Sequence, residues 1–318
     1  MHDALVGATG FVGGNLLRQR EFGATYRSST IDLARGSRFG TLVIAGAPGS
    51  MFAANRDPDA DAQAIRTMTD VLRTTKAVQA VLISTIAVLA DPASGADEAA
   101  SEFEATLAYG RHRRQLERWC HDHFPRCLVV RLPALFGTGL RKNFLFDLHN
   151  PMPSMLTDAR YASLLLTLDP RTAKIVRNHY HWSDAGAMWI LDRAEWRTSA
   201  DRTSTEQLVA AAGFSAVGFT NPESQFQYYP LRRLWRDIKV ATDAGLDMLH
   251  CATAPVRAGD VFERLAGGEM PTSPARIHRE RMTTRHGHLW GRDSEFLMSR
   301  DEVLDEIVTW ARDPEREA

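Results

Sequence analysis

The segment LVGATGFVGGNLL, residues 5–17, constrains the fold of this chain more than any other stretch. Three glycines in it follow a short apolar run directly and open a helical pattern. In such a strand, loop and helix, one glycine permits a tight turn, one lets the backbone approach a pyrophosphate, and one allows close helix packing. The first N–H groups of the helix remain open to phosphate oxygens. We predict a dinucleotide-binding loop, with an ordinary strand-to-helix turn as the alternative. The cofactor-binding residues expected here are Gly7, Thr9, Gly10, Phe11, Val12 and Gly13.

Short apolar runs alternate with helical patterns along the first 140 residues, which is typical of a parallel sheet covered by helices. The runs that predict strands are residues 4–6, 23–27, 41–46, 80–85 and 127–135. Residues 59–75 carry an apolar stripe at helical spacing (Ala62, Ile65, Met68 or Thr69, Leu72). The connection from Arg27 to Thr41 is too short for a full strand and helix, so we expect one strand–helix unit to be trimmed there.

These patterns predict an α/β, doubly wound parallel-sheet Rossmann fold with a smaller C-terminal substrate lobe. We expect residues 1–140 to form the dinucleotide-binding domain and residues 141–318 mainly the substrate-binding lobe, with segments around 221–255 returning to the first domain. In the second half, a helix is expected near residues 203–213, capped by Thr203 or Ser204 and ended by Gly213. Residues 231–246 predict an amphipathic helix, and Ser299 is expected to cap a terminal helix.

Composition narrows the function. The 318 residues are 44% hydrophobic and 24% charged with a formal net charge of -1, which gives no bulk electrostatic reason to bind nucleic acid or an anionic membrane. The expected partner is a small-molecule substrate, and the chain acts as a monomer or as a homodimer. The cysteines Cys120, Cys127 and Cys251 lack a disulfide or metal spacing. Without a signal-like start or a long apolar run, we expect a cytoplasmic protein.

The end of the second predicted strand bears on the choice of cofactor. A carboxylate at this point would bind the 2′-hydroxyl of an adenosine ribose. The sequence has Arg27 instead, followed by Ser28 and Ser29. A guanidinium and two hydroxyls suit a 2′-phosphate, so NADP is preferred over NAD. Asp32 would favour NAD if the strand ended later, and a solvated charge at Arg27 is the simplest alternative.

The segment AYGRHRRQLERWC, residues 108–120, predicts a helix with Tyr109 and Arg113 on one face. The same stripe continues through Leu116, Trp119 and Cys120, so this face is expected to pack on the sheet. A surface ion pair between Arg113 and Glu117 is the alternative.

Four segments in order resemble the extended short-chain dehydrogenase/reductase family, also called the NAD-dependent epimerase/dehydratase family. They are GATGFVG, VLISTIAVLADP, YGRHR and VVRLPALFGTG, which cover roughly residues 4–140. The resemblance implies that Tyr109 is the acid/base, that Thr85 (or the adjacent Ser84) binds the reacting oxygen, and that Arg113 stands where the family has lysine. It also implies cofactor contacts at Ala45, Gly46 and Pro133, besides Tyr109 and Arg113.

The arginine matters because a tyrosine with a pKa of about 10 needs a nearby positive charge to act as a base at neutral pH. Arginine supplies the charge and can reach ribose hydroxyls, but it does not lose a proton. Hydride transfer remains open to such a site, whereas a proton relay through lysine does not.

The second lobe is expected to bind substrate, in this family commonly a nucleotide-linked sugar. Asn143 resembles an asparagine that the family turns toward substrate, and Gln225, Gln227 and Tyr228 are expected at a pocket edge. The basic stretch of residues 275–291, including Arg285, suits phosphate or carboxylate groups, with a solvated surface as the alternative. Three His-x-His pairs have no third ligand at a recognisable spacing, so no metal is expected.

The sequence therefore predicts an NAD(P)-dependent oxidoreductase or epimerase/dehydratase acting on a secondary alcohol or ketone of a sugar-like substrate. A catalytically silent NADP(H)-binding sensor or scaffold is the alternative.

Overall fold

The computed structural model describes residues 1–184 and 186–313, and the chain divides into two compact units. Unit 1 comprises residues 1–140, 225–256 and those from 279 onward, and unit 2 comprises residues 141–224 and 257–278. The C-terminal segment belongs to unit 1, whereas the sequence assigned it to the second lobe. Backbone hydrogen bonds explain this difference, because the N–H groups of Arg281 and Thr283 donate to the carbonyls of Pro92 and Ala96.

Unit 1 is built on a parallel sheet. In the described residues it has six strands, in the order β12-β5-β4-β3-β1-β2. Their bounds are β1 Ala4–Val6, β2 Ala24–Tyr26, β3 Arg38–Ile44, β4 Lys76–Thr85, β5 Cys127–Leu132 and β12 Met248–His250. Every described pairing between them is parallel, so all carboxyl ends lie at one edge. The predicted α/β Rossmann fold is confirmed.

The connection from β2 to β3 is trimmed, as expected from its length. A single 3-10 turn, η1 (Ile31–Ala34), replaces the helix that would lead to an outer strand. The chain therefore returns to the other side of β1, where β3 pairs with it. Strand order reverses at β1, and the crevice at such a switch point is where sheets of this class bind ligands.

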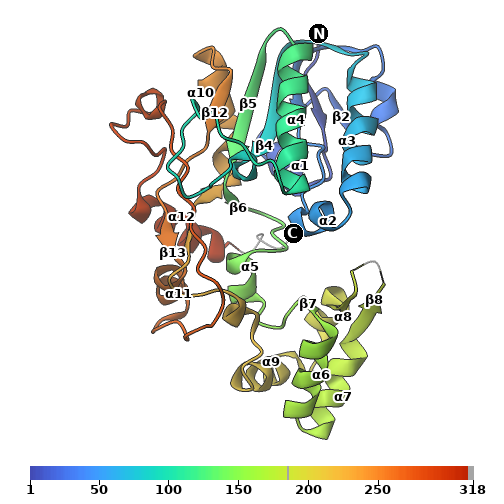
Figure 1. The fold of residues 1–318 in the computed structure, drawn as a ribbon, viewed down its shortest axis with the longest axis vertical. Coiled ribbons are helices and arrows are strands. Elements are labelled where there is room, and N and C mark those ends of the chain that lie inside the picture. The colour runs from blue at the N-terminus through green and yellow to red at the C-terminus, as the bar shows by residue number, and fades with distance from the viewer. Residues whose placement is uncertain (185, 314–318) are drawn as a thin grey trace. The chain divides into compact units, whose positions relative to one another are not determined.

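Helices cover both faces of the sheet. The helices α3 (Pro58–Leu72) and α4 (Ala108–His123) contact each other and lie side by side along one face (Figure 1). Alternate strand residues point to opposite faces, so Ala4 and Val6 join the core under α3 and α4 while Leu5 joins the other core. That second core includes residues of α1 (Phe11–Leu17) and α10 (Leu234–Asp243).

The helix ends follow local capping chemistry. Ser299 caps α12 (Arg300–Ala311) in a capping box with Glu302, as the sequence predicted for Ser299. The helix α9 (Arg202–Ala211) begins earlier than predicted, with Asp201 at its N-cap. Gly213, at φ +79°, follows its end.

Unit 2 combines short helices with a small antiparallel sheet. Its strands are β7 Met155–Leu156, β8 Tyr180–Ser183 and β9 Met188–Leu191, and its helices include α5 Phe144–His149, α6 Asp158–Thr167, α7 Pro170–His179, α8 Arg193–Thr198 and α11 Ala258–Ala266. The fully buried Trp196 lies in its core.

The remaining short elements are α2 Met51–Arg56, β6 Ala134–Phe136, β10 Gln225–Phe226, β11 Tyr228–Pro230, β13 Val256–Arg257 and the 3-10 turns η2 Ile86–Val88, η3 Ala216–Phe219, η4 Leu231–Arg233 and η5 Gly287–Trp290. Among the described helices, none has the length and apolar character needed to cross a membrane.

Candidate active site

The glycine loop has the close contacts that its sequence predicts. Gly7 has φ +90°, and a Cβ there would lie 2.3 Å from the carbonyl oxygen of Ala45. A Cβ on Gly13 would lie 2.1 Å from the carbonyl oxygen of Gly7. Only glycine fits both positions, because the neighbours they would meet are backbone atoms. No side chain caps the start of α1 at Gly10, where Thr9 and Gly10 are exposed and Phe11 and Val12 are half-buried.

Strands β1 and β3 converge behind this loop. The N–H of Ala45 donates to the carbonyl of Val6 at 2.9 Å. A Cβ on Gly46 would lie 2.9 Å from the side chain of Val6 and 3.0 Å from the sulfur of Met68. A glycine at residue 46 avoids both contacts and lets the chain after β3 pass close to the glycine loop. Ala45 and Gly46 therefore border the glycine loop at the switch point.

Arg27 directly follows β2, beside the same loop. The carbonyl of Tyr26, the last residue of β2, accepts hydrogen bonds from the N–H groups of Gly7 and Ala8. Arg27 and Ser28 are exposed. Asp32 instead lies in η1 and pairs with Arg35 at 2.9 Å, away from the strand end.

At the end of β4, two adjacent hydroxyls face different partners. Ser84 is buried and donates to Oε1 of Glu117 at 2.6 Å. The Thr85 hydroxyl accepts from the N–H of Ala87 and lies close enough to the Tyr109 phenol to lower the pKa of that phenol. Of the two candidates, Thr85 is thus the one that meets the tyrosine.

The start of α4 holds Tyr109 in place. The N–H of Tyr109 donates to the side-chain oxygen of Asn55 in α2 at 2.9 Å. A Cβ on the next residue, Gly110, would lie 2.0 Å from the carbonyl oxygen of Ala87, so a glycine is required where α4 meets η2. Sequence reasoning missed Asn55 and Gly110, although the Tyr-Gly pair was visible.

Arg113 is buried and its guanidinium is bound by other residues of unit 1. It forms a bidentate ion pair with Asp61 of α3, with Nη1 to Oδ2 at 2.5 Å and Nη2 to Oδ1 at 2.8 Å. Nη2 also donates to the carbonyl of Pro48. The guanidinium carbon lies 4.0 Å from the ring centroid of Tyr109. His112 adds a hydrogen bond from Nδ1 to Oδ2 of Asp61 at 2.8 Å.

The alternative of a surface pair between Arg113 and Glu117 is wrong, because both residues are buried and bind other groups. Glu117 accepts from Arg131 of β5, at 3.0 Å from Nε and 2.7 Å from Nη2. Arg114, on the same helix, donates to its Oε2 at 2.8 Å.

These contacts set the ionisation of the site. Burial alone would raise the pKa of Asp61, but hydrogen bonds and charge from Arg113 and His112 hold it below its usual value. Burial raises the pKa of the Tyr109 phenol, and Arg113 and the Thr85 hydroxyl lower it only in part. The net result is a phenol that ionises less readily than a free tyrosine.

The other predicted contact residues are spread over both units. Pro133 is buried directly after β5. In unit 2, Asn143 has φ 106° and caps α5 by accepting from the N–H of Phe146. In unit 1, Gln225 is half-buried on β10, and Arg285 pairs with Asp97 at 3.3 Å.

The expected pocket-edge role of Gln227 does not fit its surroundings. Gln227 is fully buried and its side-chain amide is bound internally, donating to the carbonyls of Thr253 and Met282 and accepting from the N–H of Met282. Tyr228 is buried as well. Among the described residues, no group of three potential metal ligands is assembled.

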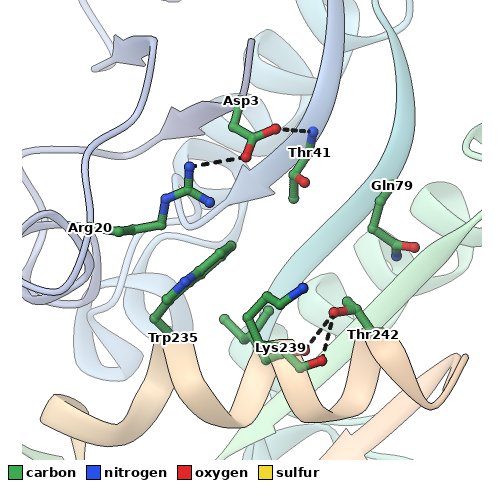
Figure 2. Close-up of a pocket in the computed structure, with 8 residues that line it drawn as sticks. Asp3, Arg20, Thr41, Gln79, Trp235, Lys239 and Thr242 are labelled. Carbon is green, nitrogen blue, oxygen red and sulfur yellow. Dashed lines mark hydrogen bonds and ion pairs between the residues drawn. The ribbon is translucent and has the colours of Figure 1, made fainter. Parts of the chain in front are cut away.

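Figure 2 shows another pocket of unit 1, away from the glycine loop and Tyr109. Its volume is about 140 Å³. Asp3, which precedes β1, borders it and binds Arg20 at 3.0 Å. The lining residues are Asp3, Arg20, Thr41, Gln79, Trp235, Ile238, Lys239 and Thr242. None of the predicted site residues is among them, and Asp3 places the pocket toward the amino ends of the strands, opposite to Thr85.

Comparisons with known proteins support the fold. Neither a protein-family model nor a curated protein matches the sequence. Among solved structures, UDP-galactose 4-epimerase is 14% identical with a TM-score of 0.59, and the match covers 100% of this chain and 98% of that one. MoeE5 in complex with UDP-glucose and NAD is 12% identical with a TM-score of 0.59, covering 98% and 99% of the two chains. A dTDP-4-dehydrorhamnose reductase from Bacillus anthracis in complex with NADP is 12% identical with a TM-score of 0.57, covering 96% of each.

Proposed function

We propose that this chain is an NAD(P)-dependent oxidoreductase or epimerase/dehydratase that acts on a secondary alcohol or ketone of a nucleotide-linked sugar. The observation that carries the proposal is the Tyr109 ring 4.0 Å from the buried Arg113 guanidinium, beside Thr85 at the carboxyl end of β4. The glycine loop follows β1 at the same edge of the parallel sheet. A proton donor and a dinucleotide-binding loop at one edge are the requirements of nicotinamide-dependent chemistry.

The residues of the loop fit a nicotinamide dinucleotide. Gly7 and Gly13 let the loop pack directly on the backbone of Ala45 and of Gly7 itself, and the start of α1 is uncapped, so its N–H groups can bind a pyrophosphate. Ala45, Gly46 and Pro133 would line the ribose and nicotinamide portions. When bound, the nicotinamide supplies or accepts a hydride. Tyr109 then transfers the proton, and Thr85 hydrogen-bonds the reacting oxygen.

NADP is the proposed cofactor, with NAD second. Arg27 and Ser28 are exposed beside the glycine loop, where a guanidinium would bind a 2′-phosphate. Asp32 lies in η1 and not at the end of β2, which supports NADP over NAD. The Arg27→Ala variant should bind NADP(H) at least about tenfold more weakly while NAD(H) affinity changes little. Equal losses for both cofactors would contradict this assignment.

The substrate class is supported by the solved structures that share the fold, which include nucleotide-sugar enzymes. We propose that unit 2 provides the substrate lobe, with Asn143 as a contact. Gln225 and Arg285 of unit 1 are proposed as further contacts. The buried free cysteines suit a reducing cytoplasm, and a homodimer is the proposed assembly alternative to a monomer.

A silent NADP(H)-binding sensor is the second candidate, and one observation favours it. The guanidinium of Arg113 donates to Asp61 and Pro48, so two of its nitrogens are already engaged rather than directed at a ribose. Such a protein would bind cofactor without turning over substrate.

Turnover separates the two functions. Candidate nucleotide-sugars and their keto forms are added with protein and cofactor. Net oxidation or reduction should change the cofactor absorbance at about 340 nm, whereas epimerisation or dehydration regenerates the cofactor and is followed by chromatography of the sugar product. The Tyr109→Phe variant keeps the ring over Arg113 but lacks the proton, so it should lose about 10²-fold or more of this rate. Cofactor binding by the same variant is the control. A protein that binds cofactor but turns over none of these substrates would support the sensor.

A further inference from the structure

We propose that Asp61 is a positioning residue that balances the charge of Arg113 and so keeps Tyr109 a neutral phenol, set to donate a proton to a carbonyl. The donation of a proton to a carbonyl rests on the proposed function. The balancing of the Arg113 charge by Asp61 does not. Asp61 lies in α3, outside the sequence segments that carry the family resemblance. Among the described bonds it is linked to Tyr109 only through Arg113.

The geometry fixes the arginine in one orientation. Both carboxylate oxygens of Asp61 accept from the two terminal nitrogens of Arg113, and the two residues are 6% and 3% exposed. The carbonyl of Pro48 accepts from the same guanidinium. A planar fork bound on two sides has little freedom to turn, so its face stays over the Tyr109 ring at 4.0 Å.

The groups that face Tyr109 come from several elements. Arg113 on α4 brings a positive charge and Asp61 on α3 a negative one. Asn55 on α2 accepts from the backbone N–H of Tyr109, and the uncharged hydroxyl of Thr85 at the end of β4 lowers the pKa of the phenol. His112 faces Asp61 on its other side. The charge of Asp61 offsets part of the charge of Arg113 at the phenol, and burial has the largest influence on the ionisation of Tyr109.

The direction of the phenol pKa agrees with this balance. Burial raises it, the charge of Arg113 lowers it, and the charge of Asp61 raises it again, so the pKa of Tyr109 stays above that of a free tyrosine. Tyr109 is therefore a neutral phenol at neutral pH. A site that begins from tyrosinate would need the opposite balance.

A neutral phenol suits reduction. The carbonyl carbon gains a hydride from a reduced nicotinamide, and the carbonyl oxygen takes the phenolic proton of Tyr109. The phenolate that remains is reprotonated from solvent, which closes the cycle. In the reverse direction the alcohol proton would have to pass to a phenolate that is scarce at neutral pH.

The test is the titration of Tyr109 in the Asp61→Asn variant of the full chain. Tyrosine labelled with ¹³C at Cζ gives one NMR signal for each of the six tyrosines, and the Tyr109→Phe variant assigns the one of interest. Removing the carboxylate leaves the positive charge of Arg113 unbalanced, so the pKa of Tyr109 should fall by about one unit or more. An unchanged Tyr109 titration would overturn the proposal.

Asp237→Asn is the matched control, because it removes another buried carboxylate of unit 1, one that pairs with Arg233 and accepts from Tyr229. It should move the signal of Tyr229 and leave that of Tyr109 in place. If Asp61→Asn does not fold, Arg113→Gln is compared with the double variant Asp61→Asn/Arg113→Gln. The pKa of Tyr109 should be lower in the double variant, and equal values would overturn the proposal.

Turnover is measured separately. Where the wild-type protein catalyses oxidation, Asp61→Asn should shift the pH profile of the oxidation rate toward lower pH, and an unchanged profile would contradict the proposed direction. If no substrate turns over while the titration shifts as expected, the charge balance holds and the proposed function fails. If turnover occurs but the titration does not shift, only the role of Asp61 fails.

Discussion

Helix α4 carries two buried ion pairs one turn apart, and they differ in what surrounds them. Arg113 faces Asp61 of α3 and the ring of Tyr109. Glu117 faces Arg131 of β5, and both are fully buried. The same kind of pair therefore occurs once beside a candidate proton donor and once inside the packed layer between helix and sheet.

The Glu117–Arg131 pair belongs to a polar row across the sheet. Arg131 is the register partner of Ser84 on β4 and of His250 on β12. Ser84 donates to Glu117, and Nη1 of Arg131 contacts Nε2 of His250 at 3.1 Å. Each charge has several partners, as a buried ion pair requires. This pair joins α4 to three strands, whereas the Asp61–Arg113 pair joins α4 to α3 and the loop at Pro48.

Burial and ion pairing alone therefore do not identify a functional site. The pKa of Glu117 is held below its usual value in the same way as that of Asp61. Burial alone would raise both values, but the hydrogen bonds and charges of the neighbouring groups together outweigh it. What separates the two pairs is the neighbour: Arg113 lies against an ionisable phenol next to a strand end. Glu117 lies against groups that are already part of the core.

The largest expected effect is the loss of stability when Glu117 is removed. Glu117→Leu leaves Arg131 charged, fully buried and without its carboxylate, which costs about 3–5 kcal/mol in the free energy of unfolding. Urea unfolding followed by circular dichroism measures this. The double variant Glu117→Leu/Arg131→Leu should recover most of the loss, because two apolar side chains replace the pair. A double variant as unstable as the single one would show that Arg131 is not the cause.

The two ion pairs show which features of the fold and the site can be predicted from the sequence. The glycine loop, the strands and the inward face of α4 depend on local patterns, and the structure has them at the expected places. The partner of Arg113 lies 52 residues away and that of His250 lies 119 residues away, so no local spacing reveals them. A signal was nevertheless present, because Arg131 interrupts an otherwise apolar strand and a charge there requires a buried partner.

Asp61 left a weaker signal. The helix at residues 59–75 was expected to bury a stripe beginning at Ala62, but the structure buries Asp61 together with Ile65 and Met68. Asp61 stands four residues before Ile65, on the same face. A carboxylate on the inward face of an amphipathic helix predicts a cation on the facing element. The apolar pattern by itself does not say that this cation is Arg113.

A smaller effect is expected from Asp61→Asn. The amide oxygen can still accept from Arg113, but the amide NH₂ cannot accept and the charge is lost, so we expect a loss of about 2–3 kcal/mol at pH 7, less than for Glu117→Leu. The depressed pKa of Asp61 makes its stabilisation present above pH 3.8 and lost as pH falls through the lower value in the folded state. The difference from wild type should therefore shrink below about pH 4. Urea unfolding at pH 7, 5, 4 and 3.5 tests this, and a constant difference would speak against the ionised pair.

The smallest effect concerns His250, at the end of the polar row. Its Nδ1 faces the carbonyl of Thr283 at 2.9 Å and must carry the proton, so Nε2 accepts from Arg131 and the ring is neutral. Burial, together with the charge of Arg131, lowers the pKa of His250 despite the opposing charge of Glu98. In the unfolded chain His250 therefore takes up a proton near pH 6.5, whereas in the folded chain it stays neutral at that pH. Stability from this group is complete above pH 6.5 and falls as the pH decreases toward the lower folded value.

His250→Asn removes this dependence while its amide can still donate and accept. Between pH 6.5 and 5.5 the free energy of unfolding of wild type should fall by up to about 1 kcal/mol more than that of the variant. Asp147 of unit 2, whose pKa burial raises to about 7, contributes with the opposite sign in this range, but it is present in both proteins and cancels in the difference. Equal slopes in urea unfolding at pH 7.5, 6.5 and 5.5 would mean that His250 accepts a proton in the folded state. The row would then tolerate a second cation beside Arg131, and its charge balance would resemble that of the Asp61–Arg113 pair, where His112 shares the carboxylate with the arginine.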